Sequence, residues 1–317
     1  MKSILWIATG GTIASVETDR GLAPGLGAEE LLKFVPEIRT ICRVEARQIC
    51  NLDSTDIGLE EWKAMTSVLE EEYDRFDGFV ISHGTDTMAY TAAVLSYMIQ
   101  NAQKPIVLTG SQLPPGSPDS DARQNLKDAF LYASDGMARG VSVVFGGKAI
   151  DGRRAKKLRS KSLDAFASIN APELARIQDG RVIWTCSPEE KKPAITEEGP
   201  VFFYDMRPEC CVLKLTPNLS TDLFRGILKK VPGVVLESFG LGGIPACLRH
   251  CLCEEMQNRD KKGFVTMLTT QVLFEGSDMS VYEVGREILQ KTSVMDCGDM
   301  TTEAALAKTM WLLGQKN

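Results

Sequence analysis

The sequence predicts an α/β protein with a larger N-terminal domain on a doubly wound parallel sheet and a smaller C-terminal α/β domain. Short apolar runs end abruptly in clusters of Gly, Thr and Ser, and amphipathic stretches of helical length separate them. With 317 residues, 44% of them hydrophobic, the chain is long enough for about two domains. Strands that alternate with helices of this length indicate βαβ units and a parallel sheet.

Three buried strands are expected in the N-terminal domain, over residues 4–8, 78–81 and 106–108. Each runs into a polar cluster: Thr9-Gly-Gly-Thr-Ile13, Ser82-His-Gly-Thr-Asp-Thr87 and Thr109-Gly-Ser-Gln112. Helices are expected over 59–76, 88–100 and 122–134, the last with Ser117, Asp119 and Ser120 as candidate caps. Because ligands of parallel sheets sit outside the carboxyl ends of the strands, the three clusters should converge at one edge.

The alternating pattern breaks around a proline-punctuated polar stretch, which predicts a linker over residues 188–209. The linker would join an N-terminal α/β domain of residues 1–187 to a C-terminal domain of residues 210–317. In that second domain, strands are expected over 211–215, 234–239 and 264–268. Helices are expected over 223–230, 246–259, 281–290 and 302–313.

Composition excludes several classes of function. A net charge of −6 argues against a nucleic-acid-binding protein. No apolar run approaches the ~20 residues that span a bilayer, and residues 1–9 are too short for a signal peptide. We therefore expect a cytoplasmic protein without a membrane partner. Two histidines and cysteine pairs that lack Cys-x-x-Cys spacing predict no metal centre.

Two of the polar clusters carry hydroxyls that suit a nucleophile. Thr12 follows a Gly-Gly turn at a strand end, and Thr85 and Asp86 lie at a strand-to-helix corner, where helix N-terminal amides favour anions. A turn hydroxyl for Thr12 and a helix cap for Thr85 or Asp86 are the simpler interpretations. A hydroxyl nucleophile also needs a base, and a lysine serves if its surroundings lower its pKa from about 10.4. Spacing alone does not choose among Lys156, Lys157 and Lys161, which lie in a basic stretch that solvent could equally well surround.

Two further loops offer polar groups to a ligand. Ser54 and Thr55 suit a substrate carboxylate, although a simple turn is the commoner meaning of such residues. The Gly110-Ser111-Gln112 loop supplies backbone N–H groups and an amide that fit the lining of the same pocket. Residues 9–14 lack the third glycine of a dinucleotide fingerprint and the Gly-Lys-Ser/Thr of a P-loop, so nucleotide binding is the weaker hypothesis.

Taken together, these loops resemble the bacterial-type asparaginase/glutaminase family. The segment Ile7-Ala-Thr-Gly-Gly-Thr-Ile-Ala14 resembles its first signature, and Gly78-Phe-Val-Ile-Ser-His-Gly-Thr-Asp-Thr-Met88 resembles its second. Similarity continues through 53–56, 108–112, 120–126, 152–166, 237–245 and 299–303, so it covers essentially the whole chain. The resemblance implies hydrolysis of L-asparagine to L-aspartate and ammonia without a metal or organic cofactor. It also implies the cytoplasmic, type I branch of the family and a homodimer or homotetramer.

The resemblance also assigns roles to residues. It implies that Thr12 is the primary nucleophile and that Thr85, Asp86 and Lys157 form a second catalytic group. Lys157 is chosen here by counting back from Asp164-Ala-Phe166. The implied substrate-binding residues are Gly11, Asp53, Ser54, Thr55 and Ser111.

At three positions the sequence departs from the pattern of the family. Leu22 stands where a tyrosine usually assists the nucleophile, Gly243 where relatives often carry asparagine, and Val272 where some type I members use a regulatory cysteine. The alternatives are a glutaminase or dual-specificity amidase, or a non-catalytic amino-acid- or nucleotide-binding module. A tRNA-dependent amidotransferase subunit would be expected to carry an additional N-terminal module, whereas the first strand here begins at Ile4.

Overall fold

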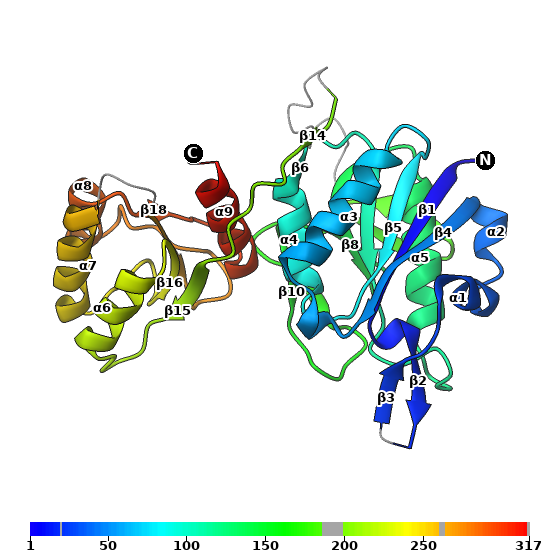
Figure 1. The fold of residues 1–317 in the computed structure, drawn as a ribbon, viewed down its shortest axis with the longest axis horizontal. Coiled ribbons are helices and arrows are strands. Elements are labelled where there is room, and N and C mark those ends of the chain that lie inside the picture. Colours follow the sequence, from blue (N-terminus) through cyan, green and yellow to red (C-terminus); the bar gives the residue numbers. More distant parts are fainter. Residues whose placement is uncertain (20, 186–198, 260–263, 316–317) are drawn as a thin grey trace. The chain divides into compact units, whose positions relative to one another are not determined.

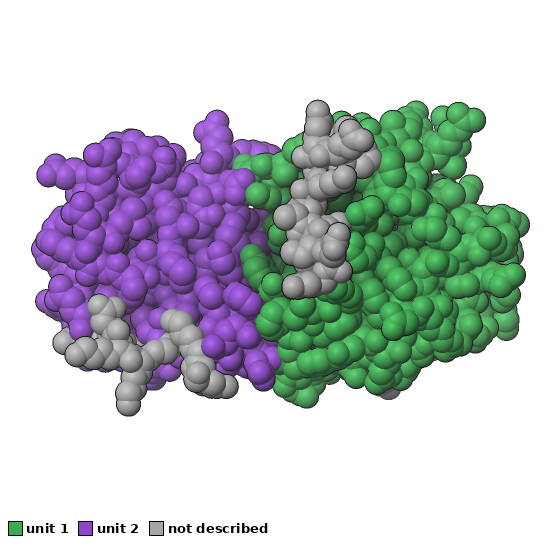
Figure 2. All heavy atoms as spheres, turned by 90° about the horizontal axis from the view of Figure 1, so that it is seen from above, with its two compact units in different colours: residues 1–204 green, residues 205–317 purple. Residues whose placement is uncertain are grey.

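A computed structural model of the protein describes residues 1–19, 21–185, 199–259 and 264–315. The chain divides into two compact units, residues 1–204 and residues 205–317, which Figure 2 colours separately. Half of the predicted linker, residues 188–198, lies outside the described residues. Among the residues that are described, no helix is both long and apolar enough to cross a bilayer.

The N-terminal unit is built on a sheet of eight strands whose central part is parallel (Figure 1). The parallel strands, in spatial order, are β8 (Gly140–Phe145), β7 (Pro105–Thr109), β5 (Gly78–Ser82), β1 (Ser3–Gly10) and β4 (Arg43–Leu52). Strands β5 and β7 are buried along their whole length, which explains why they read as continuous apolar runs. The predicted parallel sheet is confirmed.

Three antiparallel strands extend the sheet beyond β8: β9 (Lys148–Asp151), β12 (Ala175–Gln178) and β13 (Arg181–Trp184). Two tight turns create this extension. Gly146 and Gly147 have φ of 57° and 72°, and Asp179 and Gly180 have φ of 51° and 71°. Pairs of residues with positive φ match the right-handed twist of antiparallel hairpins, and Gly-Gly and Asp-Gly are typical of such turns. The alternation of strands and helices along the sequence does not reveal these hairpins.

Helices cover both faces of the sheet (Figure 1). One face carries α1 (Ala28–Phe34), α2 (Ile38–Ile41) and α5 (Ala122–Ser134), which share a core with Trp6, Val80 and Val107. The other carries α3 (Leu59–Glu71) and α4 (Met88–Met98). The chain runs from β1 outward to β4 and then returns to β5 before it continues to β7 and β8. The order of strands therefore reverses between β1 and β5, which is where ligands bind in doubly wound sheets.

Short elements complete this unit. They are the 3-10 turns η1 (Thr12–Ala14) and η2 (Ser54–Asp56) and the paired strands β2 (Ser15–Thr18) with β3 (Gly21–Pro24), β10 (Ala155–Lys157) with β11 (Phe166–Ser168), and β6 (Ile99–Gln100) with β14 (Val201–Phe202). Helix α3 ends five residues before the predicted Phe76. Tyr73 and Phe76 beyond its end pack against Phe79 of β5, with ring centroids 5.9 and 6.4 Å away.

The predicted capping of α5 is only partly correct. Ser120 Oγ accepts a hydrogen bond from Ala122 N at 3.2 Å, but the residue that precedes the helix is Asp121. The Asp121 carboxylate makes no cap hydrogen bond to the helix backbone; it accepts the backbone N–H groups of Gln112 and Leu113, at 3.0 and 3.1 Å. This carboxylate therefore connects α5 to the loop that follows β7.

The C-terminal unit has a parallel sheet of four strands, β15 (Cys210–Lys214), β16 (Gly233–Ser238), β17 (Val265–Thr270) and β18 (Met295–Asp296). Its helices are α6 (Thr221–Lys230), α7 (Ala246–Arg259), α8 (Glu283–Lys291) and α9 (Thr302–Gly314). Ser220 and Thr301 cap α6 and α9 through their hydroxyl oxygens. Leu228, Leu248 and Leu268 belong to one core cluster, and Val235 and Leu313 to another. The predicted second α/β domain is confirmed.

Helix α5 also buries a carboxyl group, which makes stability depend on pH. Asp128 is 2% exposed and accepts a hydrogen bond from Gln124 Nε2 at 2.7 Å. Burial raises the pKa of this carboxyl from 3.8 to about 6. Because the folded pKa lies above the unfolded one, this group favours the folded state at low pH. That advantage is lost as the pH rises from about 4 to 6.

We therefore expect Asp128→Asn to stabilise the protein at pH 7, by about 2–3 kcal/mol, and to change the free energy of unfolding little at pH 4. Asparagine resembles the protonated acid and keeps the acceptor for Gln124. Urea unfolding of wild type and variant at the two pH values measures the difference. An equal effect at both values would show that Asp128 does not titrate between them.

Candidate active site

The loops after four neighbouring strands meet at one edge of the N-terminal sheet. Ala8 of β1 pairs with Ser82 of β5, and Ser82 pairs with Thr109 of β7, so the three strands end at the same level. On the other side of β1, Gly10 pairs with Leu52 at the end of β4. The predicted convergence of the polar clusters is confirmed, and the loop after β4 joins them.

Glycine allows two of these loops to touch through their backbones. Gly11 has a φ of 79°, and a Cβ atom there would lie 2.3 Å from the Cα of Gly84. A Cβ atom on Gly84 would in turn lie 2.7 Å from the Cβ of Ser54. Real Cβ atoms do not approach other atoms this closely, so only glycine fits at both positions. Thr12 and Thr85 each follow one of these glycines, and their loops are therefore in direct contact.

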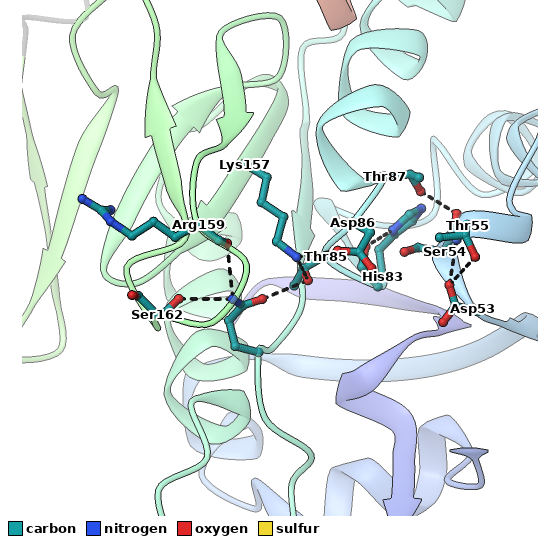
Figure 3. A network of polar contacts seen from close by, with 12 residues as sticks. Asp53, Ser54, Thr55, His83, Thr85, Asp86, Thr87, Lys157, Arg159 and Ser162 are labelled. Atoms are coloured by element: carbon teal, nitrogen blue, oxygen red, sulfur yellow. Dashed lines mark hydrogen bonds and ion pairs between the residues drawn. The ribbon is translucent and has the colours of Figure 1, made fainter. Parts of the chain in front are cut away.

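A hydroxyl, a carboxylate and an amine form the centre of the site (Figure 3). Lys157 Nζ donates hydrogen bonds to Thr85 Oγ1 at 2.7 Å and to Asp86 Oδ1 at 2.6 Å. Thr85 is 6% exposed, and the side chains of Lys157 and Asp86 are 16% and 63% exposed. The structure therefore brings together three of the four predicted catalytic side chains, with the lysine amine largely shielded from water.

The fold also explains which lysine reaches Thr85. Lys157 ends β10 and pairs with Phe166 of β11. Neighbouring residues of a strand point to opposite faces, so Lys156 points away from Lys157. Lys161 lies in the exposed loop that follows. Of the three lysines that spacing left open, Lys157 is the one that contacts Thr85 and Asp86.

Neither Thr85 nor Asp86 caps the helix that follows. Helix α4 is preceded by Thr87, whose hydroxyl donates to the Ser54 carbonyl at 2.6 Å. The simpler interpretation of Thr85 and Asp86 as cap residues is therefore wrong. Their side chains are engaged with Lys157 instead.

The buried ring of His83 contacts the backbone of the loop that carries Thr85 and Asp86. Its ring is fully buried, with Nδ1 2.7 Å from the Gly84 carbonyl and Nε2 2.9 Å from Thr91 Oγ1, which also accepts a hydrogen bond from Trp62 Nε1 at 2.9 Å. Burial lowers the pKa of His83 to about 4, so the ring is neutral near pH 7. A carbonyl can only accept, so Nδ1 carries the proton. His83 therefore fixes the backbone of Gly84 and does not face Thr85 as a base.

Thr12 lies at the start of η1 and is half-buried. Gly11 precedes it, with its N–H on the Leu52 carbonyl at 2.9 Å and its own carbonyl accepting Ala14 N at 2.9 Å. Within the described part of the chain, the Thr12 hydroxyl has no hydrogen-bond partner. Leu22 belongs to β3, where its backbone pairs with Glu17, but its side chain lies outside what the structure describes.

The loop after β4 places Asp53, Ser54 and Thr55 beside this corner (Figure 3). Asp53 Oδ1 accepts hydrogen bonds from Thr55 N at 2.8 Å and from Thr55 Oγ1 at 2.7 Å. These two bonds hold the pKa of Asp53 below its ordinary value. Ser54 is buried and packs against Gly84. The loop is thus a turn, and it also presents an ionised carboxylate at the site.

The loop after β7 contributes a residue that sequence reasoning undervalued. Ser111 is buried, and its hydroxyl donates to the Leu113 carbonyl at 2.6 Å within its own loop. The neighbouring Gln112 accepts a hydrogen bond from Thr85 Oγ1 at 3.0 Å. The sequence indicated Gln112 only as an amide near the pocket, because no spacing rule links it to Thr85.

Other residues of interest lie in the C-terminal unit. Gly243 N donates to the Phe239 carbonyl at 2.6 Å, and Val272 is exposed. Among the residues that the structure describes, no three acidic, histidine or cysteine side chains gather in a way that could hold a metal ion.

Comparisons with known proteins match both units. The family model described as "Asparaginase, N-terminal" matches residues 3–190, and that described as "Glutaminase/Asparaginase C-terminal domain" matches residues 187–317. An L-asparaginase of Thermococcus kodakarensis is 41% identical over 98% of this chain and 92% of its own length. The solved structure of the thermostable L-asparaginase from that organism has a TM-score of 0.90, at 40% identity over 99% of this chain and 93% of the other.

Two further relatives show the range of the similarity. A glutamyl-tRNA(Gln) amidotransferase protein of Pyrococcus furiosus is 34% identical over 100% of this chain and 73% of its own length. A solved structure of a probable cytoplasmic L-asparaginase from Campylobacter jejuni has a TM-score of 0.84, at 25% identity over 99% of this chain and 96% of the other. The similarity extends across both units in each case.

Proposed function

Because the chain belongs to the asparaginase family, we propose that it is an L-asparaginase, which hydrolyses the side-chain amide of L-asparagine to L-aspartate and ammonia. The observation that carries the proposal is the contact of Lys157 Nζ with Thr85 Oγ1 at 2.7 Å and with Asp86. A binding module has no need of an amine held between a buried hydroxyl and a carboxylate. An amidohydrolase uses such an arrangement to move protons.

In the proposed reaction, the Thr12 hydroxyl attacks the amide carbon of the substrate. The C–N bond breaks, the nitrogen leaves as ammonia with the proton from the attacking hydroxyl, and an ester of Thr12 remains. Water then attacks the ester, so that L-aspartate leaves and the Thr12 hydroxyl is restored. Backbone N–H groups of the glycine-containing loops stabilise the tetrahedral oxyanion, at about 3–4 kcal/mol for a well-placed donor.

Lys157 and Asp86 serve the proton transfers in this scheme. The ammonium form of Lys157 donates to both Thr85 and Asp86. After Lys157 loses a proton, the lone pair of its amine faces Thr85 Oγ1. The amine then accepts a proton that the Thr85 hydroxyl relays to it. Asp86 keeps the amine in place through the 2.6 Å ion pair.

The loop after β4 is proposed to bind the α-carbon groups of the substrate. The Asp53 carboxylate pairs with the α-ammonium group, and the small polar groups of Ser54 and Thr55 receive the α-carboxylate. Gly11 and Ser111 border the pocket. We also retain the cytoplasmic location and the homodimeric or homotetrameric state as predictions; light scattering of the purified protein tests the latter.

Whether the enzyme prefers L-asparagine or L-glutamine distinguishes an asparaginase from a glutaminase. L-Glutamine is longer than L-asparagine by one methylene, which a pocket distinguishes by about 1–3 kcal/mol. An amidotransferase protein, the Pyrococcus furiosus relative, belongs to the same family.

The test is ammonia release by the purified protein from L-asparagine and from L-glutamine. We expect one ammonia for each L-aspartate formed and a higher kcat/KM for L-asparagine. A higher kcat/KM for L-glutamine would make the protein a glutaminase. Absence of turnover with both amides would contradict the enzymatic proposal.

A further inference from the structure

Gln112 connects the hydroxyl of Thr85 to the segment that carries Lys157. Its Oε1 accepts a hydrogen bond from Thr85 Oγ1 at 3.0 Å. Its Nε2 donates to the carbonyl of Ser162 at 3.2 Å and to that of Arg159 at 3.5 Å, both just beyond Lys157 in the chain (Figure 3). One side chain therefore contacts both Thr85 and the segment that follows Lys157 in the chain.

The hydrogen bonds fix which way the amide of Gln112 is turned. The carbonyls of Arg159 and Ser162 only accept, so the NH₂ group must face them. The oxygen of Gln112 then faces Thr85, and since it too only accepts, the proton of the Thr85 hydroxyl points toward Gln112. A lone pair of Thr85 Oγ1 is left to accept from Lys157 Nζ. While Lys157 is an ammonium group that donates to Thr85, Gln112 thereby sets the side-chain orientation of Thr85 and the direction of its proton.

The backbone of Gln112 is anchored as firmly as its side chain. Both oxygens of Asp121 lie 3.0 Å from Gln112 N. Asn125 Nδ2 donates to Asp121 Oδ2 at 3.0 Å and to the Gly110 carbonyl at 3.0 Å. Asp121 and Asn125 are both buried, at the start of α5. Gln112 is therefore held by a helix of the scaffold, as a residue that positions a reacting group must be.

We propose that Gln112 is a positioning residue for Thr85, which holds the Thr85 hydroxyl in line with Lys157 and keeps the Lys157 segment at the required distance. This inference rests on the proposed amidohydrolase function. It assigns Gln112 no contact with the substrate. Loss of the residue should therefore slow the chemistry rather than weaken binding.

The first test is Gln112→Leu, which removes both arms of the amide at nearly constant volume. We expect kcat for L-asparagine to fall about 10- to 100-fold, as misplacement of a reacting group generally causes, with KM within about threefold of wild type. The matched control is Gln103→Leu, at an amide whose hydrogen bonds to described residues both go to Asn101 in the loop before β7. This control should leave both constants unchanged.

The second test is Gln112→Glu, which keeps an acceptor for Thr85 but adds a negative charge next to Lys157. A negative charge within about 4–6 Å favours the protonated amine. The rise of kcat/KM with pH should therefore move to higher pH by at least about half a unit. The shift requires residue 112 to lie close to the Lys157 amine, across Thr85, so a residue that supports the fold from elsewhere would leave the profile unchanged. Thermal unfolding of each variant shows whether it is folded.

The outcomes separate the inference from the proposed function. If wild type releases no ammonia, the proposed function fails. If wild type is active but Gln112→Leu has normal kcat, the inference about Gln112 is wrong and the function stands. A lowered kcat that comes with a lowered melting temperature, and with an unshifted pH profile in Gln112→Glu, would also overturn it, because support of the fold would explain the loss.

Discussion

Thr12→Ala is expected to lower kcat for L-asparagine hydrolysis by about 10⁴-fold or more, as the loss of a nucleophile generally does. The physical reason is that alanine cannot form the ester intermediate. The remaining backbone N–H groups would stabilise only a direct attack by water. The fold should be unaffected, because the Thr12 hydroxyl makes no hydrogen bond within the described residues and the turn is defined by the backbone bonds of Gly11. Steady-state ammonia release measures the change.

Thr12→Ser is the matched control, since it keeps the hydroxyl and removes only a methyl group. It should retain far more activity than the alanine variant. Mass spectrometry of acid-quenched wild type should find an aspartyl ester on the peptide that contains Thr12. Turnover of Thr12→Ala close to that of wild type would remove Thr12 from the catalytic group, and an ester on another residue would name its replacement.

Lys157→Met should lower kcat by about 10²–10⁴-fold, the usual range for the loss of a general acid–base group. Methionine keeps most of the volume of the lysine stem but can neither donate to Thr85 nor accept its proton. The variant should remain folded, because Asp86 is 63% exposed and stays solvated when its partner is gone. The free energy of unfolding should change by about 1 kcal/mol at most, because one partner of the ion pair is exposed.

Lys161→Met provides the control for this variant, because Lys161 belongs to the same basic stretch and is exposed. It should leave kcat and KM unchanged. If both variants lose activity equally, the basic stretch acts through its overall charge and not through the amine at Thr85. If neither loses activity, the proton transfers proceed without Lys157.

The fold was predictable where burial leaves a clear pattern. Strands β5 and β7 are buried throughout, and apolar up to their last residue, because helices cover both faces of the sheet; α5 has the predicted bounds. Strand β4 was not predicted. It lies at the edge of the sheet, and many of its residues are exposed and polar, among them Arg43, Glu45 and Arg47. The strand therefore lacks the continuous apolar run that marks the central strands. Charged side chains on an edge strand prevent pairing with other chains, so this composition has its own physical reason.

The site was predictable to the level of its loops. A hydroxyl-rich corner at a strand end is visible in the sequence, but the partner of Thr85 is not. Lys157 lies 72 residues away, and its contact depends on the pairing of β10 with β11. Gln112 was noted only as an amide near the pocket, since its role arises from two carbonyls beyond Lys157. Such contacts follow from the fold, which spacing along the chain does not encode.

The contact between Gly11 and Gly84 has a consequence for attempts to redesign the specificity of the protein. Because two main chains meet there, the separation of Thr12 from Thr85 is set by backbone and cannot be adjusted by choosing other rotamers. Room for a longer or bulkier amide must therefore come from the walls contributed by the other loops. Substitutions in those loops, and not at the two glycines, are therefore the ones that could change which amide is accepted.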